Sequence, residues 1–304
     1  MATGFLAVAP GCRGFPYHRS DAVEAKAAKA GVRRFEVETG PYSGLSDLTT
    51  DVRGHFWSVP ERDRVLLRLH LEGPQPGVDA PPIAITGISN DLDTEAIAWL
   101  SEDKFAIGTE SQSAQRASDD VLLVTVQGDS ATVTNRIALP YSLWNMTAAR
   151  NQGIEGLCYA GGHLIAAGET VGLTSEGRRF APVGRFDTSK NAWMPFSLLL
   201  TSETGKISAL ACRQDPADSR ITVLAVERHF GVAKLLRFAV PTSGEGGPIT
   251  PEVIVDFARV IEGLPNYEGV AWSLQNDIYM LTDNNMGIEI GPTEGVVIPK
   301  TWVR

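Results

Sequence analysis

The sequence is poor in the residues that mark several common classes of functional site. Its 304 residues include three cysteines, Cys12, Cys158 and Cys212, and five histidines. The cysteines have no CxxC spacing and the histidines no HExxH spacing, so we expect neither a zinc site nor a disulfide framework. The motifs GxSxG, GxGxxG and GxxxxGK(S/T) are also absent, which disfavours a serine-esterase elbow and a nucleotide-binding loop.

Basic residues and long apolar runs are scarce as well. Lys and Arg total 27 against 36 Asp and Glu, for a net charge of −9, so nucleic acid and anionic membranes are not expected partners. No apolar run is long enough to span a bilayer. The stretch MATGFLAVAPGC has no Lys or Arg before its short apolar run, so we expect no export signal in this chain. That leaves a cytoplasmic protein or one exported after trimming.

Glycine and proline are abundant, at 30 and 18 residues, and a weak repeat runs through the chain. A short pattern recurs about every 50 to 60 residues, and each copy is followed by a turn and further strand-like runs. The copies read SGLSDL at Ser43, TEAIAW at Thr94, IEGLCY at Ile154, ISALAC at Ile207 and YEGVAW at Tyr267, with apolar anchors Leu45, Ile97, Leu157, Leu210 and Val270.

Four short strands per unit predict an all-β fold, a β-propeller of five four-stranded blades, with six blades as the alternative. The last unit lacks a strand, and RRFEVETG near the N-terminus can supply it, with residues 34–39 pairing near residues 295–299. Residues 20–32 have an N-cap, an Ala-rich interior and a Gly stop, which predicts a short surface helix. We therefore expect one domain, with residues 1–33 as an extension and residues 34–304 as the propeller.

Acidic residues recur at two positions of the repeat, before the first strand and after the second. In a propeller the first strand leaves one face and the second strand returns to it, so both positions meet around the central channel. A crowd of carboxylates there needs a cation, and Ca2+ suits it because it takes 6 to 8 oxygen ligands. A structural role as caps of backbone amides is the alternative. The acids are Glu61, Glu95, Glu110, Glu155, Glu169, Glu227, Glu268 and Asp283, with Asn284 among the nearby amides.

Other repeated positions suggest packing. Trp99, Tyr159 and Trp272 follow their anchors by two residues and are expected to pack between blades, and Cys158 and Cys212 are expected to be small buried residues. Arg116, Arg150, Arg179 and Arg228 lie near the acids, where a guanidinium would suit a phosphate or carboxylate group. His229 is a candidate acid or base, although a lone histidine at a strand end is more often a partly buried hydrogen-bonding residue.

At DLDTEAIAWLSEDKFAIGTE, NQGIEGLCYAGGHLIAAGE, ITVLAVERHF and NYEGVAWSLQNDIYMLTDNN, the chain resembles the phytase-like propeller family, named for esterase-like activity of phytase. The resemblance spans about residues 43 to 297. It implies a propeller with calcium near the channel and phosphate-ester hydrolysis. Two units depart from the motif, because ISALAC has Ser208 in place of an acid and SGLSDL has no Glu. The matching positions are Glu95, Glu155, Glu227, Arg228, Glu268, Asp283 and Asn284.

These observations favour a calcium-dependent hydrolase of a phosphate ester or related ester, acting as a monomer on a small molecule that could be anionic. A propeller enzyme with another metal-assisted reaction and a non-catalytic calcium-binding module are the alternatives. The expected catalytic residues are Glu155, Glu227, Arg228 and His229. The expected substrate-binding residues are Arg116, Arg150 and Arg179. The expected metal ligands are Glu95, Glu155, Glu169, Glu268, Asp283 and Asn284.

Overall fold

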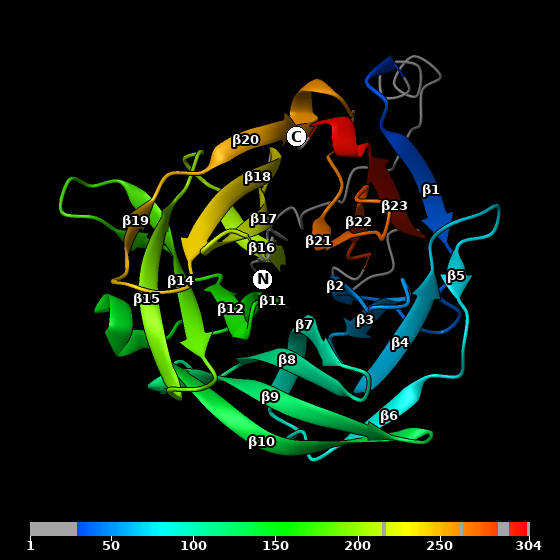
Figure 1. Cartoon of the computed structure of the whole chain (residues 1–304), viewed down its shortest axis with the longest axis horizontal. Helices are drawn as coiled ribbons and strands as arrows, with labels where there is room; N and C mark the ends of the chain where they lie inside the picture. The colour runs from blue at the N-terminus through cyan, green and yellow to red at the C-terminus, as the bar shows by residue number, and fades with distance from the viewer. Residues whose placement is uncertain (1–28, 215–216, 262–263, 285–291, 303–304) are drawn as a thin grey trace, which may run out of the picture.

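The computed structural model describes residues 29–214, 217–261, 264–284 and 292–302. The helix expected over residues 20–32 falls almost entirely outside these ranges, as does Cys12. Within them the named elements are strands and three short 3-10 helices. No helix in the described part of the chain is long and apolar enough to cross a membrane. The predicted all-β propeller is confirmed (Figure 1).

The strands follow one another in units around a central axis. The first unit holds β2 (Leu45–Thr50), β3 (Phe56–Pro60), β4 (Val65–His70), β5 (Gly77–Val78) and β6 (Ile83–Thr86). The second holds β7 (Leu92–Ser101), β8 (Lys104–Ser111), β9 (Ser118–Gln127) and β10 (Ser130–Pro140), followed by η1 (Tyr141–Trp144). The third holds β11 (Ile154–Ala160), β12 (His163–Gly168), β13 (Gly172–Leu173), β14 (Arg179–Asp187) and β15 (Ala192–Leu199).

The remaining strands complete the ring. The fourth unit holds β16 (Lys206–Gln214), β17 (Arg220–His229), β18 (Val232–Pro241) and β20 (Glu252–Asp256), followed by η2 (Phe257–Arg259). The last holds β21 (Tyr267–Trp272), β22 (Ile278–Thr282) and β23 (Thr293–Ile298), followed by η3 (Lys300–Trp302), and it is joined by β1 (Arg33–Val37). Strand β19 (Gly247–Ile249) leaves the fourth unit and pairs in parallel with β15 of the third.

The innermost strands β2, β7, β11, β16 and β21 contact one another in a closed ring (Figure 1). In the described residues an apolar core fills each of the interfaces between neighbouring units. Trp99, Tyr159 and Trp272 pack against three of these cores, as expected. The first two units share one sheet because β6 pairs with β4 on one side and in parallel with β10 on the other. Sheet membership therefore does not divide the ring into equal blades.

The expected closure of the ring by an N-terminal strand is confirmed. Strand β1 pairs antiparallel with β23 from Arg33 opposite Val297 to Val37 opposite Thr293, slightly earlier in the C-terminal segment than the sequence predicts. An ion pair between Arg34 and Glu294, both nearly buried, ties the two strands together. The first and last parts of the described chain thus share one sheet.

A disulfide joins Cys158 of β11 to Cys212 of β16, with the Cα atoms 5.6 Å apart. Cys158 is buried, as expected, but the bond between the two residues was not predicted. Three cysteines are too few for a framework of bridges, but inner strands of neighbouring units lie close enough for a single one. The bridge lies near the end of the inner strands remote from the acids, in the wall of a cavity of about 90 Å³ that Trp99, Tyr159 and Trp272 also line.

Candidate functional site

Every inner strand contains a β-bulge near its start, at the position of the repeated acid. A bulge leaves one residue outside the ladder and redirects its side chain. The register shifts lie between Ser46 and Thr49, Thr94 and Ala96, Ile154 and Gly156, Ile207 and Ala209, and Tyr267 and Gly269. The bulged residues are therefore Glu95, Glu155, Ser208 and Glu268, with Asp47 and Leu48 in the first unit.

The glycine of each Glu-Gly pair lies where a neighbouring inner strand packs too closely to leave room for a side chain. A Cβ atom on Gly156 would lie 2.7 Å from Cγ of Leu210 in the next inner strand, and one on Gly269 would lie 3.1 Å from the carbonyl carbon of Asp47. Inner strands thus approach closely just after the acid. The Glu-Gly pair combines a side chain turned toward the axis with a backbone that allows a neighbouring strand to come near.

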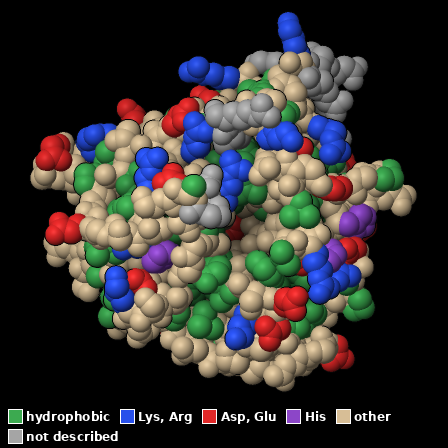
Figure 2. All heavy atoms as spheres, in the orientation of Figure 1, with side chains coloured by type: hydrophobic (Ala, Val, Ile, Leu, Met, Phe, Trp, Pro, Cys, Tyr) green, Lys and Arg blue, Asp and Glu red, His purple; other side chains and the backbone are tan. Residues whose placement is uncertain are grey.

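The bulged acids form the centre of a carboxylate cluster. Oxygens of Glu95, Glu155 and Glu268 all lie within 4.8 Å of one another, and all three side chains are buried. Glu95 also forms such a group with Asp93 and Glu110, and Glu268 forms one with Glu61 and Asp283. We call these seven residues the acid cluster. Figure 2 shows a hollow near the axis in which acidic side chains are visible.

Burial and mutual repulsion raise the pKa values of the five glutamates of the acid cluster. Loss of water is the largest cause for each glutamate, followed for most of them by the charge of neighbouring carboxylates. The pKa of Glu110 is raised to about 8 and that of Glu61 to about 7. The pKa values of Glu95 and Glu155 are raised well above their usual range. In its fully ionised form the cluster would therefore have more negative charge than its own surroundings compensate.

Two cations lie beside this cluster. Arg228, at the end of β17, forms an ion pair with Glu268, and this partly offsets the rise in the Glu268 pKa that burial causes. Lys206 places Nζ 3.2 Å from Oε1 of Glu169. Glu169 is an eighth carboxylate of this region, and its charge helps to raise the pKa of Glu155. Asn266 donates from Nδ2 to Glu268 at 2.8 Å and to Asp283 at 3.3 Å.

Asp47 also lies in this region, and the sequence did not predict it. It is 1% exposed, and its carboxylate accepts hydrogen bonds from the backbone N–H of Leu48 at 2.8 Å, Ile97 at 3.3 Å and Leu157 at 3.2 Å. The N–H of Val270 is a fourth donor. Ile97, Leu157 and Val270 are the apolar anchors of their units, and Leu48 donates to the same carboxylate. The anchor of the first unit is therefore Leu48 and not Leu45. Aligning SGLSDL on Leu48 would have placed Asp47 where other units have Gly or Ala.

The comparison with protein families identifies the chain. The model described as phytase-like, esterase-like activity of phytase, matches residues 40–286. The chain belongs to this phytase-like family. No curated protein matches it.

Several solved structures resemble the phytase-like chain at low identity. They include the PQQ-bound aldose sugar dehydrogenase from Streptomyces coelicolor, at 10% identity and TM-score 0.48, which covers 88% of this chain and 98% of that one. The virginiamycin B lyase from Staphylococcus aureus has 8% identity and TM-score 0.42, with 88% and 99% covered. The Trypanosoma rangeli sialidase has 11% identity and TM-score 0.43, with 90% and 60% covered. Similarity at this level carries no argument about activity.

Three of the residues expected in the site of this phytase-like protein have other surroundings. Glu227 is fully buried and accepts hydrogen bonds from the backbone N–H and hydroxyl groups of Thr201 and Ser202, so it anchors the loop after β15. Asn284 accepts from the N–H of Gly44 at 3.0 Å. His229 lies at the rim, partly exposed, with its ring 4.8 Å from that of the exposed Phe230. Burial and nearby Lys206 lower the pKa of His229.

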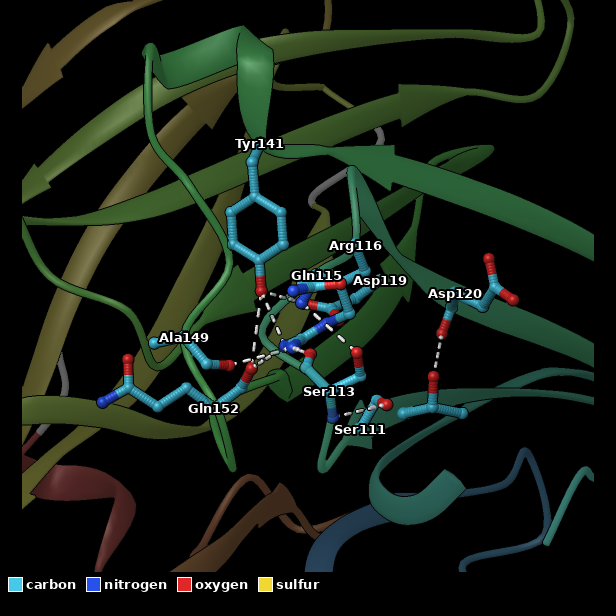
Figure 3. Close-up of polar contacts among 10 residues, drawn as sticks. Ser111, Ser113, Gln115, Arg116, Asp119, Asp120, Tyr141, Ala149 and Gln152 are labelled. Carbon is cyan, nitrogen blue, oxygen red and sulfur yellow. Dashed lines mark hydrogen bonds and ion pairs between the residues drawn. The ribbon is translucent and has the colours of Figure 1, made fainter. Parts of the chain in front are cut away.

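The guanidinium of Arg116 is used within the fold (Figure 3). It donates to Asp119 at 2.6 Å, to the Tyr141 hydroxyl at 3.0 Å and to the Ala149 carbonyl at 2.9 Å. It also donates to the carbonyls of Ser113 and Gln152. Arg116 thus holds the segment that leads into Glu155, and little of it is left to bind a substrate.

The other two arginines expected to bind substrate are placed differently. Arg179 donates to the carbonyl oxygens of Ser202 at 2.8 Å and Gly205 at 2.9 Å, so it supports the same loop as Glu227. Arg150 is exposed on the segment before β11. The structure therefore brings together Glu95, Glu155, Glu169, Glu268, Asp283 and Arg228 from the expected set.

Proposed function

We propose that this phytase-like protein is a calcium-dependent hydrolase of a phosphate ester or a related ester. The observation that carries the proposal is the acid cluster: seven carboxylates in three overlapping groups, five of them buried and two half-buried, with Arg228 in contact. Family membership supports ester chemistry. The substrate class and the identity of the metal are the proposed parts.

The donor set suits calcium. Glu95, Glu155 and Glu268 present only oxygen atoms, and these lie within 4.8 Å of one another, about twice the usual calcium–oxygen distance of roughly 2.4 Å. One ion could therefore lie between all three. Asp93, Glu110, Glu61 and Asp283 would supply further oxygens on either side. When bound, calcium would polarise an ester oxygen and lower the pKa of a water molecule.

The chain's own residues supply the remaining roles. Arg228 is held by Glu268 with part of its side chain still exposed, 22% by area, so it could bind two oxygens of an anionic group at once. That contact would also offset the negative charge that develops during hydrolysis. Lys206 offers a second cation on the same side. His229 has a lowered pKa, is neutral at pH 7 and could accept a proton at the rim.

The proposal is tested with a substrate panel of phosphate esters, carboxylate esters and lactones, each assayed with calcium and with chelator. Glu155→Gln removes one central ligand, and Glu294→Gln is the matched control because Glu294 is equally buried but pairs with Arg34 at the ring closure. We expect turnover that chelator and Glu155→Gln abolish and Glu294→Gln retains. Turnover that chelator leaves intact would refute calcium dependence. Bound calcium without turnover on any class would favour a binding module.

A further inference from the structure

We propose that Asp47 is the positioning residue of the acid cluster. From the axis it binds the backbones of the inner strands and so sets the distance between Glu95, Glu155 and Glu268. The effect on metal binding rests on the proposed function, whereas the effect on the inner strands does not.

The hydrogen bonds of Asp47 reach β7, β11 and β21 at the equivalent residue of each strand. Its donors Ile97, Leu157 and Val270 each lie two residues after a bulged glutamate. Each glutamate is thus separated from an axial hydrogen bond by one residue only. A change in the length of those bonds moves the three bulges relative to one another, and with them the carboxylates.

The local backbone is arranged to admit this side chain. Asp47 has a φ of 56°, in the left-handed region that Asp and Asn enter more readily than other non-glycine residues. Gly269 of the neighbouring strand leaves room, because a Cβ there would lie 3.1 Å from the Asp47 carbonyl carbon. Asp47 therefore occupies a position that the third and fifth units fill with glycine, and it extends a carboxylate from it.

The chemistry of the site also requires an acceptor at this point. Four backbone N–H groups converge on the buried carboxylate in place of water. Oδ1 accepts from Leu48 and Oδ2 accepts from Ile97 and Leu157, so an asparagine of the same shape, with a single acceptor oxygen, would turn its amide N–H groups toward one of these two sets of donors. The substitution Asp47→Asn should therefore separate the inner strands without removing volume. Ser46, the preceding residue, adds a direct link by donating from Oγ to Glu95 at 3.1 Å.

The experiment compares wild type, Asp47→Asn and the buried-carboxylate control Glu294→Gln. Amide proton chemical shifts are recorded by NMR with chelator present. They are recorded for Leu48, Ile97, Leu157 and Val270 and for the three bulged glutamates. Calcium dissociation constants are then measured by titration calorimetry. We expect Asp47→Asn to move the donor amides upfield, to shift the glutamate amides with them and to weaken calcium binding about 10- to 100-fold. Glu294→Gln should leave both measurements unchanged.

The outcomes separate this inference from the proposed function. If wild type binds no calcium, the proposed function fails and the NMR comparison alone decides the role of Asp47. If the glutamate amides or the calcium affinity stay at wild-type values while the donor amides move, Asp47 is only a structural acceptor and the inference is overturned. Should Asp47→Asn not fold, Gly269→Ala presses on Asp47 from β21 and keeps its carboxylate. It should shift the same amides and weaken binding, and no change in either would equally overturn the inference.

Discussion

Without a bound cation, the stability of the protein should fall as the pH rises from about 4.5 toward 8. Glu110 and Glu61 have usual pKa values of 4.5 that the fold raises to about 8 and about 7. A carboxyl whose pKa is raised by folding binds its proton more tightly in the folded state. Its contribution is fully present below pH 4.5 and is lost as the pH rises through the folded value.

The size of the effect follows from those two residues. Each pKa unit corresponds to about 1.4 kcal/mol, so ionising Glu110 in the folded protein costs on the order of 4 to 5 kcal/mol and Glu61 somewhat less. The two carboxyls share neighbours, so the total is smaller than their sum. Calcium at a hundred times its dissociation constant should restore about 2.7 kcal/mol, and it should flatten the slope because it binds the ionised form.

The assay is urea unfolding at pH 5, 6, 7 and 8, with chelator and with calcium. Glu110→Gln is the informative variant because it cannot ionise, so its metal-free stability should fall less between pH 5 and 8 than that of wild type. The lowered pKa values of His163 and His229 act in the opposite direction, and the difference between wild type and variant removes their contribution. Equal slopes for the two proteins would refute the assignment of buried, repelling carboxylates.

Further predictions concern the contacts that hold the ring together and the choice of metal ion. Reducing the bond between Cys158 and Cys212, which are 54 residues apart, should lower the free energy of unfolding by about 4 kcal/mol, measured by urea unfolding with and without reductant; identical curves would contradict this. Deleting residues 1–40 removes β1 and should lower the melting temperature of the whole ring in one transition, whereas a two-step melt would mean that the blades unfold separately. Arg116→Ala leaves Asp119 buried without its cation and should cost about 3 to 5 kcal/mol, with Arg116→Lys intermediate. Magnesium should raise the melting temperature less than calcium, and an equal rise would speak against a calcium site.

Much of the architecture could be predicted from the sequence because the repeat is a repeat of strands. Apolar anchors at nearly regular intervals, followed by turns, indicate inner strands of successive units, and the unpaired last unit indicates β1 as its partner. The acids of the Glu-Gly and Glu-Ala pairs were placed at the axis for the same reason. Sequence periodicity reports which residues are equivalent, and equivalent residues meet around a ring.

Periodicity does not report what a side chain bonds to once it is placed. Glu227 has the same position after a second strand as Glu110 and Glu169, yet a loop of hydroxyl and N–H groups captures its carboxylate. Arg116 lies near the acids in the sequence, but its guanidinium donates to carbonyl oxygens of another segment. Asp47 was missed because a bulge shifts the alignment of its unit. These outcomes depend on contacts between segments far apart in the chain.

The pairing of β1 with β23 has a consequence for the order of events during synthesis. Arg34 and its partner Glu294 are separated by 260 residues, and at about 5 to 20 residues per second a ribosome needs on the order of 13 to 52 seconds to make that stretch. Throughout this time β1 exists without its partner. The units in between can assemble one against the next as they emerge, but the final seam forms only after translation of β23. For most of the synthesis of the chain, β1 and the first unit therefore exist without the last strand of the ring.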